Sequence, residues 1–214
     1  MRGMCGYLPP GSDKIGGEEM TGSYDLLIVG VGGQGTILAS NIIGEACLSE
    51  GRTVRSAETH GMSQRGGSVE THIRIDGKYG PLISPGTADL IISFDLLEAV
   101  RYSHFLKKGG VIVSGKDIVV PTSTFQQGLE VPSRESLEEM LSGTEYYIID
   151  AVSAALEAGN MLSQNIVMLG AASHHLPVKP GSLLEAVKKL VPPKTVEINS
   201  KAFEIGVREG KKQP

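Results

Sequence analysis

The chain is poor in cysteine and in aromatic residues. Two cysteines, Cys5 and Cys47, occur among 214 residues, and no C-x-x-C pair is present. Iron–sulfur clusters and structural zinc sites each need about four closely spaced ligands, so this chain has no ligand set of its own for either group. Tryptophan is absent and aromatic residues make up 5% of the chain, which argues against a surface that stacks on bases. Two isolated thiols fit a reducing compartment, and we expect a cytoplasmic protein.

Long apolar runs and an excess of positive charge are also missing. No apolar stretch approaches the roughly 20 residues that span a bilayer, and none near the N-terminus is long enough for a signal peptide. The formal net charge is -4 at pH 7, so neither nucleic acid nor an anionic membrane is an expected partner. Hydrophobic residues make up 40% and charged residues 21%, as in an ordinary globular protein.

The length and composition predict one folded domain with short appendages. Residues 1–23 are rich in glycine and proline, so we expect a disordered N-terminal extension, and Met20 is an alternative start. Residues 24–210 are expected to form a single domain, because the chain is too short for two comfortable ones. Residues 211–214 are expected to be a flexible tail.

Strands and helices alternate along the predicted domain. The pattern predicts an α/β fold, three-layered and Rossmann-like, with a mixed, mostly parallel sheet flanked by helices. The predicted strands cover 24–29, 53–57, 69–75, 90–94, 111–113 and 146–149, and the predicted helices cover 34–49, 96–106, 134–141, 151–158, 165–172, 182–190 and 196–209.

One predicted strand differs from the others in its pattern. From Val69 to Ile75, aliphatic residues and threonine alternate with Glu70, His72 and Arg74. Such alternation is typical of a strand with one solvent-exposed face, which favours an antiparallel or edge strand over a buried parallel one. His72 is therefore expected on the exposed face.

Three helix starts carry capping signals. Ser133 is expected to cap the short helix that follows it, and Asp150 the helix after the last strand. Ser182 and Glu185 have the spacing of a capping box, which predicts a helix that begins at Ser182.

A glycine turn, Gly30-Val31-Gly32-Gly33-Gln34-Gly35, follows the first strand and leads into a helix. A strand, a glycine turn and a helix are the context of a dinucleotide site, in which an acidic residue about 20 residues later binds the ribose. Glu58 stands 23 residues after Gly35. This supports one hypothesis, a stand-alone NAD(P)- or FAD-binding oxidoreductase. However, Gly33 and Gln34 are atypical of such a site, so we favour a tight turn that packs on a partner.

A second cluster, 58–67, reads Glu-Thr-His-Gly-Met-Ser-Gln-Arg-Gly-Gly. Glycines this dense favour an irregular loop, and the cluster offers a carboxylate, an imidazole and a guanidinium. Either its charges pair with one another on the surface, or the loop faces a partner's active site. No positioned nucleophile is evident, so no catalytic residue and no metal ligand is predicted. The candidates to face a partner are Gly32, Gly33, Gln34, Gly35, Glu58, His60, Gln64, Arg65, Gly66 and Gly67.

The two motifs together resemble the gamma-type subunits of 2-oxoacid:ferredoxin oxidoreductases, and most closely the small subunits of the indolepyruvate type. Further similarity runs from residue 24 to about residue 210, through 79–83, 88–94, 97–99, 165–170 and 199–203. Sister subunits for pyruvate, 2-oxoglutarate or ketoisovalerate share the first motif, and a gamma subunit of that kind is an alternative.

This resemblance implies a role inside a complex. In the family, a 2-oxoacid adds to thiamine diphosphate, loses carbon dioxide, passes two electrons through iron–sulfur clusters to ferredoxin, and leaves as its coenzyme A ester. The chain lacks the Gly-Asp-Gly…Asn signature of a thiamine diphosphate and magnesium site. A larger alpha subunit is therefore expected to hold these cofactors, and the chain is expected to bind none alone and to be inactive alone. A smaller possibility is that the glycine turn and Arg65 contact coenzyme A phosphates.

Overall fold

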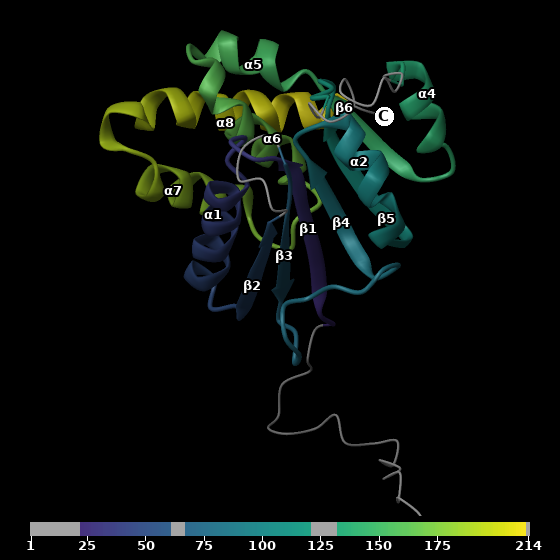
Figure 1. The fold of residues 1–214 in the computed structure, drawn as a ribbon. Coiled ribbons are helices and arrows are strands. Elements are labelled where there is room, and N and C mark those ends of the chain that lie inside the picture. The colour runs from purple at the N-terminus through teal and green to yellow at the C-terminus, as the bar shows by residue number, and fades with distance from the viewer. Residues whose placement is uncertain (1–21, 61–66, 121–131, 213–214) are drawn as a thin grey trace, which may run out of the picture.

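The computed structural model describes residues 22–60, 67–120 and 132–212, which contain one six-stranded sheet with helices on both faces (Figure 1). The strands are β1 (Tyr24–Val31), β2 (Val54–His60), β3 (Ser68–Ile75), β4 (Ala88–Ser93), β5 (Leu106–Gly115) and β6 (Glu145–Ile149). The α-helices are α1 (Thr36–Ser49), α2 (Leu96–Tyr102), α4 (Arg134–Met140), α5 (Ala151–Ala158), α6 (Gln164–Ala172), α7 (Pro180–Leu190) and α8 (Val196–Lys211).

The sheet is mixed and mostly parallel, in the order β2-β3-β1-β4-β5-β6. β1, β4, β5 and β6 are parallel neighbours, whereas β3 lies antiparallel between β1 and β2. The predicted α/β architecture is confirmed. The position of β3 separates β2 from β1, although the two are joined directly through α1.

The sheet has a separate hydrophobic core on each face, because successive strand residues point to opposite sides. In β1, Leu26 and Ile28 belong to the core under α1, α6, α7 and α8, whereas Leu27 and Val29 belong to the core under α2 and α4. All four side chains are fully buried. This explains why β1 reads as a continuous apolar run, as strands covered on both faces do.

α6 and α8 cross with their backbones in close approach. A Cβ at Gly170 would overlap the carbonyl of Phe203, and one at Gly206 would overlap the carbonyl of Val167. A helix was predicted over 165–172, and every residue of this range is buried. The crossing therefore depends on the missing side chains of these glycines.

β3 is buried more completely than its alternating pattern predicted. The prediction of an antiparallel strand is confirmed, but His72 is 4% exposed and its Nδ1 accepts the N–H of Ile83 at 3.2 Å. Arg74 makes a bidentate pair with Asp25 at 2.7 and 2.8 Å and donates to the Gly80 carbonyl. The segment after β3 thus folds back over the expected solvent face and supplies partners for its polar side chains.

Several predicted boundaries were wrong. The strand predicted over 53–57 extends to His60, and the helix predicted over 96–106 ends at Tyr102, because Leu106 already opens β5. α7 starts at Pro180 with Lys179 as its N-cap, so Ser182 lies inside the helix and forms no capping box. The caps at Ser133 and Asp150 are confirmed. No helix in the described part of the chain is long and apolar enough to cross a membrane.

Candidate functional site

Both sequence motifs meet at the carboxyl edge of the sheet, which lies at the top of the strands in Figure 1. The glycine turn (Gly30–Gly35) ends β1 there, and β3 starts there because it runs antiparallel. The Gly32 N–H donates to the Gly67 carbonyl at 2.9 Å. This hydrogen bond joins the last residue of the second motif (58–67) to the middle of the glycine turn. In open α/β sheets this edge is the usual location of functional sites.

The glycine turn satisfies several of its own backbone groups. The side-chain carbonyl of Gln34 accepts the Val31 N–H at 2.7 Å, and the Gln34 backbone N–H donates to the Val31 carbonyl at 3.1 Å. Nε2 of Gln34 donates to the Phe94 carbonyl at the end of β4 at 3.3 Å. Gln34 was predicted to start the helix, but it instead joins the ends of β1 and β4, and α1 begins at Thr36.

Two glycines in the turn have left-handed backbone conformations. Gly35 is the N-cap of α1 with φ 87°, and a Cβ there would overlap the amide of Asn165 on α6. Gly33 has φ 108°, is exposed, and among the described residues has no heavy atom within 4 Å of the place where a Cβ would stand. A side chain would strain the backbone at both glycines, and at Gly35 it would also overlap Asn165. The backbone of Gly33 remains open to a partner.

This geometry differs from that of a dinucleotide site. In such a site the acidic residue ends the strand beside β1, where it reaches the ribose. Glu58 lies on β2, with β3 between β2 and β1, so it stands two strand spacings away, roughly 10 Å. Its Oε1 accepts the Thr71 hydroxyl at 3.4 Å. Moreover, the N–H groups of Val31, Gly32 and Gln34 in the turn already have partners within the protein, so these three are not free to bind a phosphate.

The second motif is partly strand. Glu58 and His60 belong to β2, so the loop predicted to open at Glu58 was placed too early. Gly67 is described and contacts Gly32. Gln64, Arg65 and Gly66 lie outside the described residues.

A buried polar cluster beside this edge was not predicted. Glu98, on α2, is 1% exposed, and its two carboxylate oxygens accept the Ser68 hydroxyl at 2.5 Å and an Arg101 N–H at 2.6 Å. The Tyr102 hydroxyl lies 3.1 Å from Ser68 Oγ. Burial raises the pKa of the Tyr102 phenol above its usual range, and the negative charges of Glu70 and Glu98 raise it further. Single residues spread over two elements leave no local pattern, so sequence reasoning had no signal for this cluster.

A second buried carboxylate holds the end of β4. Asp95 is fully buried, and Oδ1 accepts the N–H of Glu98 at 3.0 Å while Oδ2 accepts the N–H of Val119. Burial raises the pKa of Asp95 above its usual range, although these N–H donors oppose the shift. Asp95 thus caps α2 and anchors the chain beyond β5, which is a structural task.

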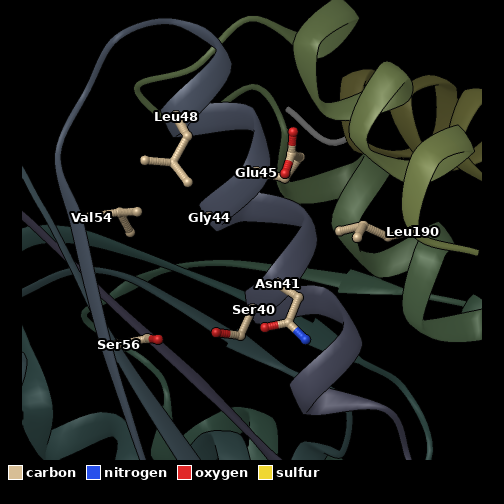
Figure 2. A pocket seen from close by; sticks show the side chains of 8 residues that line it. All are labelled: Ser40, Asn41, Gly44, Glu45, Leu48, Val54, Ser56 and Leu190. Carbon is tan, nitrogen blue, oxygen red and sulfur yellow. The ribbon is translucent and has the colours of Figure 1, made fainter.

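A groove of about 300 Å³ lies between α1 and β2. Figure 2 shows the side chains that line it, most of them on α1 and β2. Glu45 is the one titratable residue in its lining, and its carboxylate pairs with Lys189 at 2.5 Å. A single paired carboxylate offers no acid–base or ligand set. Within the described residues, no three His, Cys, Asp or Glu side chains gather as a metal site. The groove is lined by Ser40, Asn41, Gly44, Glu45, Leu48, Val54, Ser56 and Leu190.

The mixed sheet and its glycine turn define an α/β domain of a class already known from solved structures. The gamma subunit of keto/oxoacid ferredoxin oxidoreductase from Geobacter sulfurreducens is 27% identical to the chain, with a TM-score of 0.67 over 88% of this chain and 99% of that one. The family model for pyruvate ferredoxin/flavodoxin oxidoreductase matches residues 25–209. The chain belongs to this family.

Curated relatives narrow the position within the family. Indolepyruvate oxidoreductase subunit IorB of Pyrococcus horikoshii is 40% identical over 88% of this chain and 96% of its own length. The 2-oxoglutarate synthase subunit KorC of Methanothermobacter marburgensis is 29% identical over 88% of this chain and 98% of its own length. The resemblance to gamma-type subunits, and to the indolepyruvate type in particular, is confirmed.

Proposed function

We propose that this chain is the small accessory subunit of an indolepyruvate, or more broadly aryl pyruvate, ferredoxin oxidoreductase. In this proposal the carboxyl edge of the sheet faces the active site of a larger subunit. The observation that carries the proposal is the bond from Gly32 to Gly67, because it joins the two motifs at one edge of the sheet. Residues 24–210 form the functional unit, and the complex is cytoplasmic.

The larger subunit supplies the chemistry. Thiamine diphosphate with magnesium adds the 2-oxoacid and releases carbon dioxide, iron–sulfur clusters carry two electrons to ferredoxin, and coenzyme A takes the acyl group. Buried Cys47 and the distant Cys5 are too few for a cluster. The small subunit closes the assembly and shapes access to the site.

Exposed apolar side chains next to the glycine turn support docking at this edge. Ile37 follows the turn on α1 and is 52% exposed, and Leu162 is 77% exposed just before α6, whose Asn165 contacts Gly35. Large exposed apolar side chains that gather near one place are typical of protein interfaces. Gly33, which is exposed and stands four residues before Ile37, lets another backbone approach closely.

Coexpression with the large subunit of the same oxidoreductase tests this proposal. We expect a complex that carries thiamine diphosphate and iron and reduces a dye with aryl pyruvates faster than with pyruvate or 2-oxoglutarate. Purification of the chain from its native source without a thiamine- and iron-bearing partner would contradict the proposal. A preference for 2-oxoglutarate would contradict the substrate class while leaving the subunit role intact.

A matched pair of variants tests the docking edge. Gly33→Asn places a side chain at the turn. Gly143→Asn is the matched control, because Gly143 also has a positive φ (94°), also faces open space among the described residues, and precedes β6 at the amino edge of the sheet. We expect the Gly33 variant to weaken association with the large subunit about tenfold or more, as expected when a side chain intrudes at the centre of an interface. The Gly143 variant should bind like the wild type. Equal affinities for both variants would place the interface elsewhere.

The alternative of a stand-alone dinucleotide enzyme is tested by calorimetry. Because the N–H groups of Val31, Gly32 and Gln34 already have partners and β3 separates Glu58 from β1, we expect no binding heat with NAD, NADP or FAD at millimolar concentration. A saturable heat with any of them would favour that alternative.

A further inference from the structure

Glu98 is a buried carboxylate on α2, next in sequence to residues of the hydrophobic core. Its neighbours Leu96 and Ala99 are buried in the core under α2, and the Glu98 side chain is 2% exposed. Removing a carboxylate from water is costly unless its oxygens are fully bonded. Both oxygens are bonded here, to Ser68 and Arg101. We therefore expect Glu98 to have a role in addition to filling space in the core.

The bond from Glu98 to Ser68 leads directly to the glycine turn. Ser68 is the first residue of β3 and pairs with Val31, the last residue of β1. The residue before Ser68 is Gly67, whose carbonyl accepts the Gly32 N–H. A continuous path thus runs from α2 through Ser68 to the backbone of the turn.

We propose that Glu98 is a positioning residue, which acts through Ser68 to hold the Gly67 carbonyl against Gly32 and so fixes the conformation that the glycine turn presents to the larger subunit. This inference rests on the proposed function and adds to it the residue that prepares the docking edge. Arg101 keeps the Glu98 carboxylate bonded and oriented, and its own side chain is 49% exposed. The hydroxyl of Tyr102 supplies a second contact to Ser68.

The test compares this path with an ion pair at the opposite end of the sheet. Asp25 and Arg74 form a largely buried pair near the amino end of β1, so Asp25→Asn is a control for loss of stability alone. Ser68→Ala removes the hydroxyl, Glu98→Leu removes the carboxylate, and Glu98→Gln keeps an oxygen that can accept from Ser68. Each full-length chain is nitrogen-15 labelled for NMR hydrogen exchange at Gly32, and its affinity for the large subunit is measured separately.

We expect Gly32 exchange to become roughly tenfold faster in Ser68→Ala and Glu98→Leu, as loss of an ordinary hydrogen bond implies, and to stay near wild type in Asp25→Asn. Glu98→Gln should restore most of the protection. Association with the large subunit should weaken in the same order. Because Ser68 and Glu98 act in one path, the double variant should be no worse than the poorer single variant.

Equal Gly32 exchange in Ser68→Ala and Asp25→Asn would overturn the inference, and so would affinity losses that follow thermal stability across all variants. The exchange measurement needs no partner. Failure of the wild-type chain to associate would instead count against the proposed function, so the two failures are distinguishable.

Discussion

The two ends of α6 use glycine in different ways. At its start, the side chain of Asn165 covers Gly35 of the turn, and near its end Gly170 lies against the backbone of α8. Gly206 on α8 faces the backbone of α6 in return. A side-chain neighbour can be changed by mutation, whereas a backbone neighbour cannot. A second mutation at Asn165 can therefore relieve the overlap at Gly35, whereas no second mutation can relieve the overlaps with backbone atoms at Gly170 and Gly206.

The largest expected effect is at the helix crossing. Gly206→Ala forces a methyl group into the Val167 carbonyl, and α6 and α8 must separate. We expect the free energy of unfolding to fall by about 3 kcal/mol, the upper end of the usual cost of overpacking, as measured by urea denaturation. Lys201→Ala, at an exposed position of α8, is the control and should change stability little. A small loss of stability in Gly206→Ala would show that the α6–α8 crossing tolerates a side chain as well as the glycine turn does.

A smaller effect is expected at the turn. Gly35→Ala combines a left-handed backbone at φ 87° with the overlap against Asn165, and we expect a loss of about 2 kcal/mol, mostly from the backbone conformation. Adding Asn165→Ala should relieve the overlap and recover part of the loss. If the double variant recovers nothing, the contact with α6 contributes nothing and backbone conformation alone explains the glycine.

Substitutions of Gln34 test whether its side chain stabilises the glycine turn. Gln34→Ala removes the bonds to Val31 and Phe94 and should cost about 1–2 kcal/mol, the net worth of two hydrogen bonds. Gln34→Glu keeps the acceptor for the Val31 N–H but loses the donor to the Phe94 carbonyl. If the bond to Val31 dominates, the loss of stability in Gln34→Glu should be smaller than in Gln34→Ala. Urea unfolding of both variants separates the two bonds. Wild-type stability in Gln34→Ala would show that the glycines hold the turn unaided.

The smallest effect concerns reactivity. Cys47, on the core side of α1, is fully buried, and burial raises the pKa of its thiol to about 11. At pH 8 only about one thiol in a thousand is then ionised, and the thiolate is the reactive form. In a Cys5→Ser chain, a thiol reagent should label Cys47 slowly in the native state and rapidly in denaturant. Rapid native labelling would show that α1 opens more easily than the helix crossing.

Much of the fold could be predicted because it rests on local patterns. The apolar runs of β1 and β4, the caps at Ser133 and Asp150, and the buried helix α6 all leave a signal within a few neighbouring residues. The position of β3 between β1 and β2 leaves none, since strand order depends on contacts between distant segments. Glu58 therefore has the spacing along the chain of a ribose-binding residue. In the folded protein, however, β3 separates its strand from β1.

The candidate site was predictable in part. The motifs marked the carboxyl edge, and the glycines marked the turn. The role of Gln34 depends on its side chain folding back onto Val31, and the role of Glu98 depends on α2 lying over the start of β3. Neither arrangement follows from residue spacing, because each needs the packed sheet to bring its partners together.

The insertion of β3 also has a consequence for the order of folding. β2 and β3 are neighbours along the chain and pair as an antiparallel hairpin, so their contacts close short loops. β3 meets β1 only after the chain has passed through α1 and β2, and contacts between distant segments form more slowly. We therefore expect the hairpin to form first and to dock onto β1 afterwards. The bond between Gly32 and Gly67 then forms after the hairpin, when β3 docks onto β1, so the docking edge is completed only at that step.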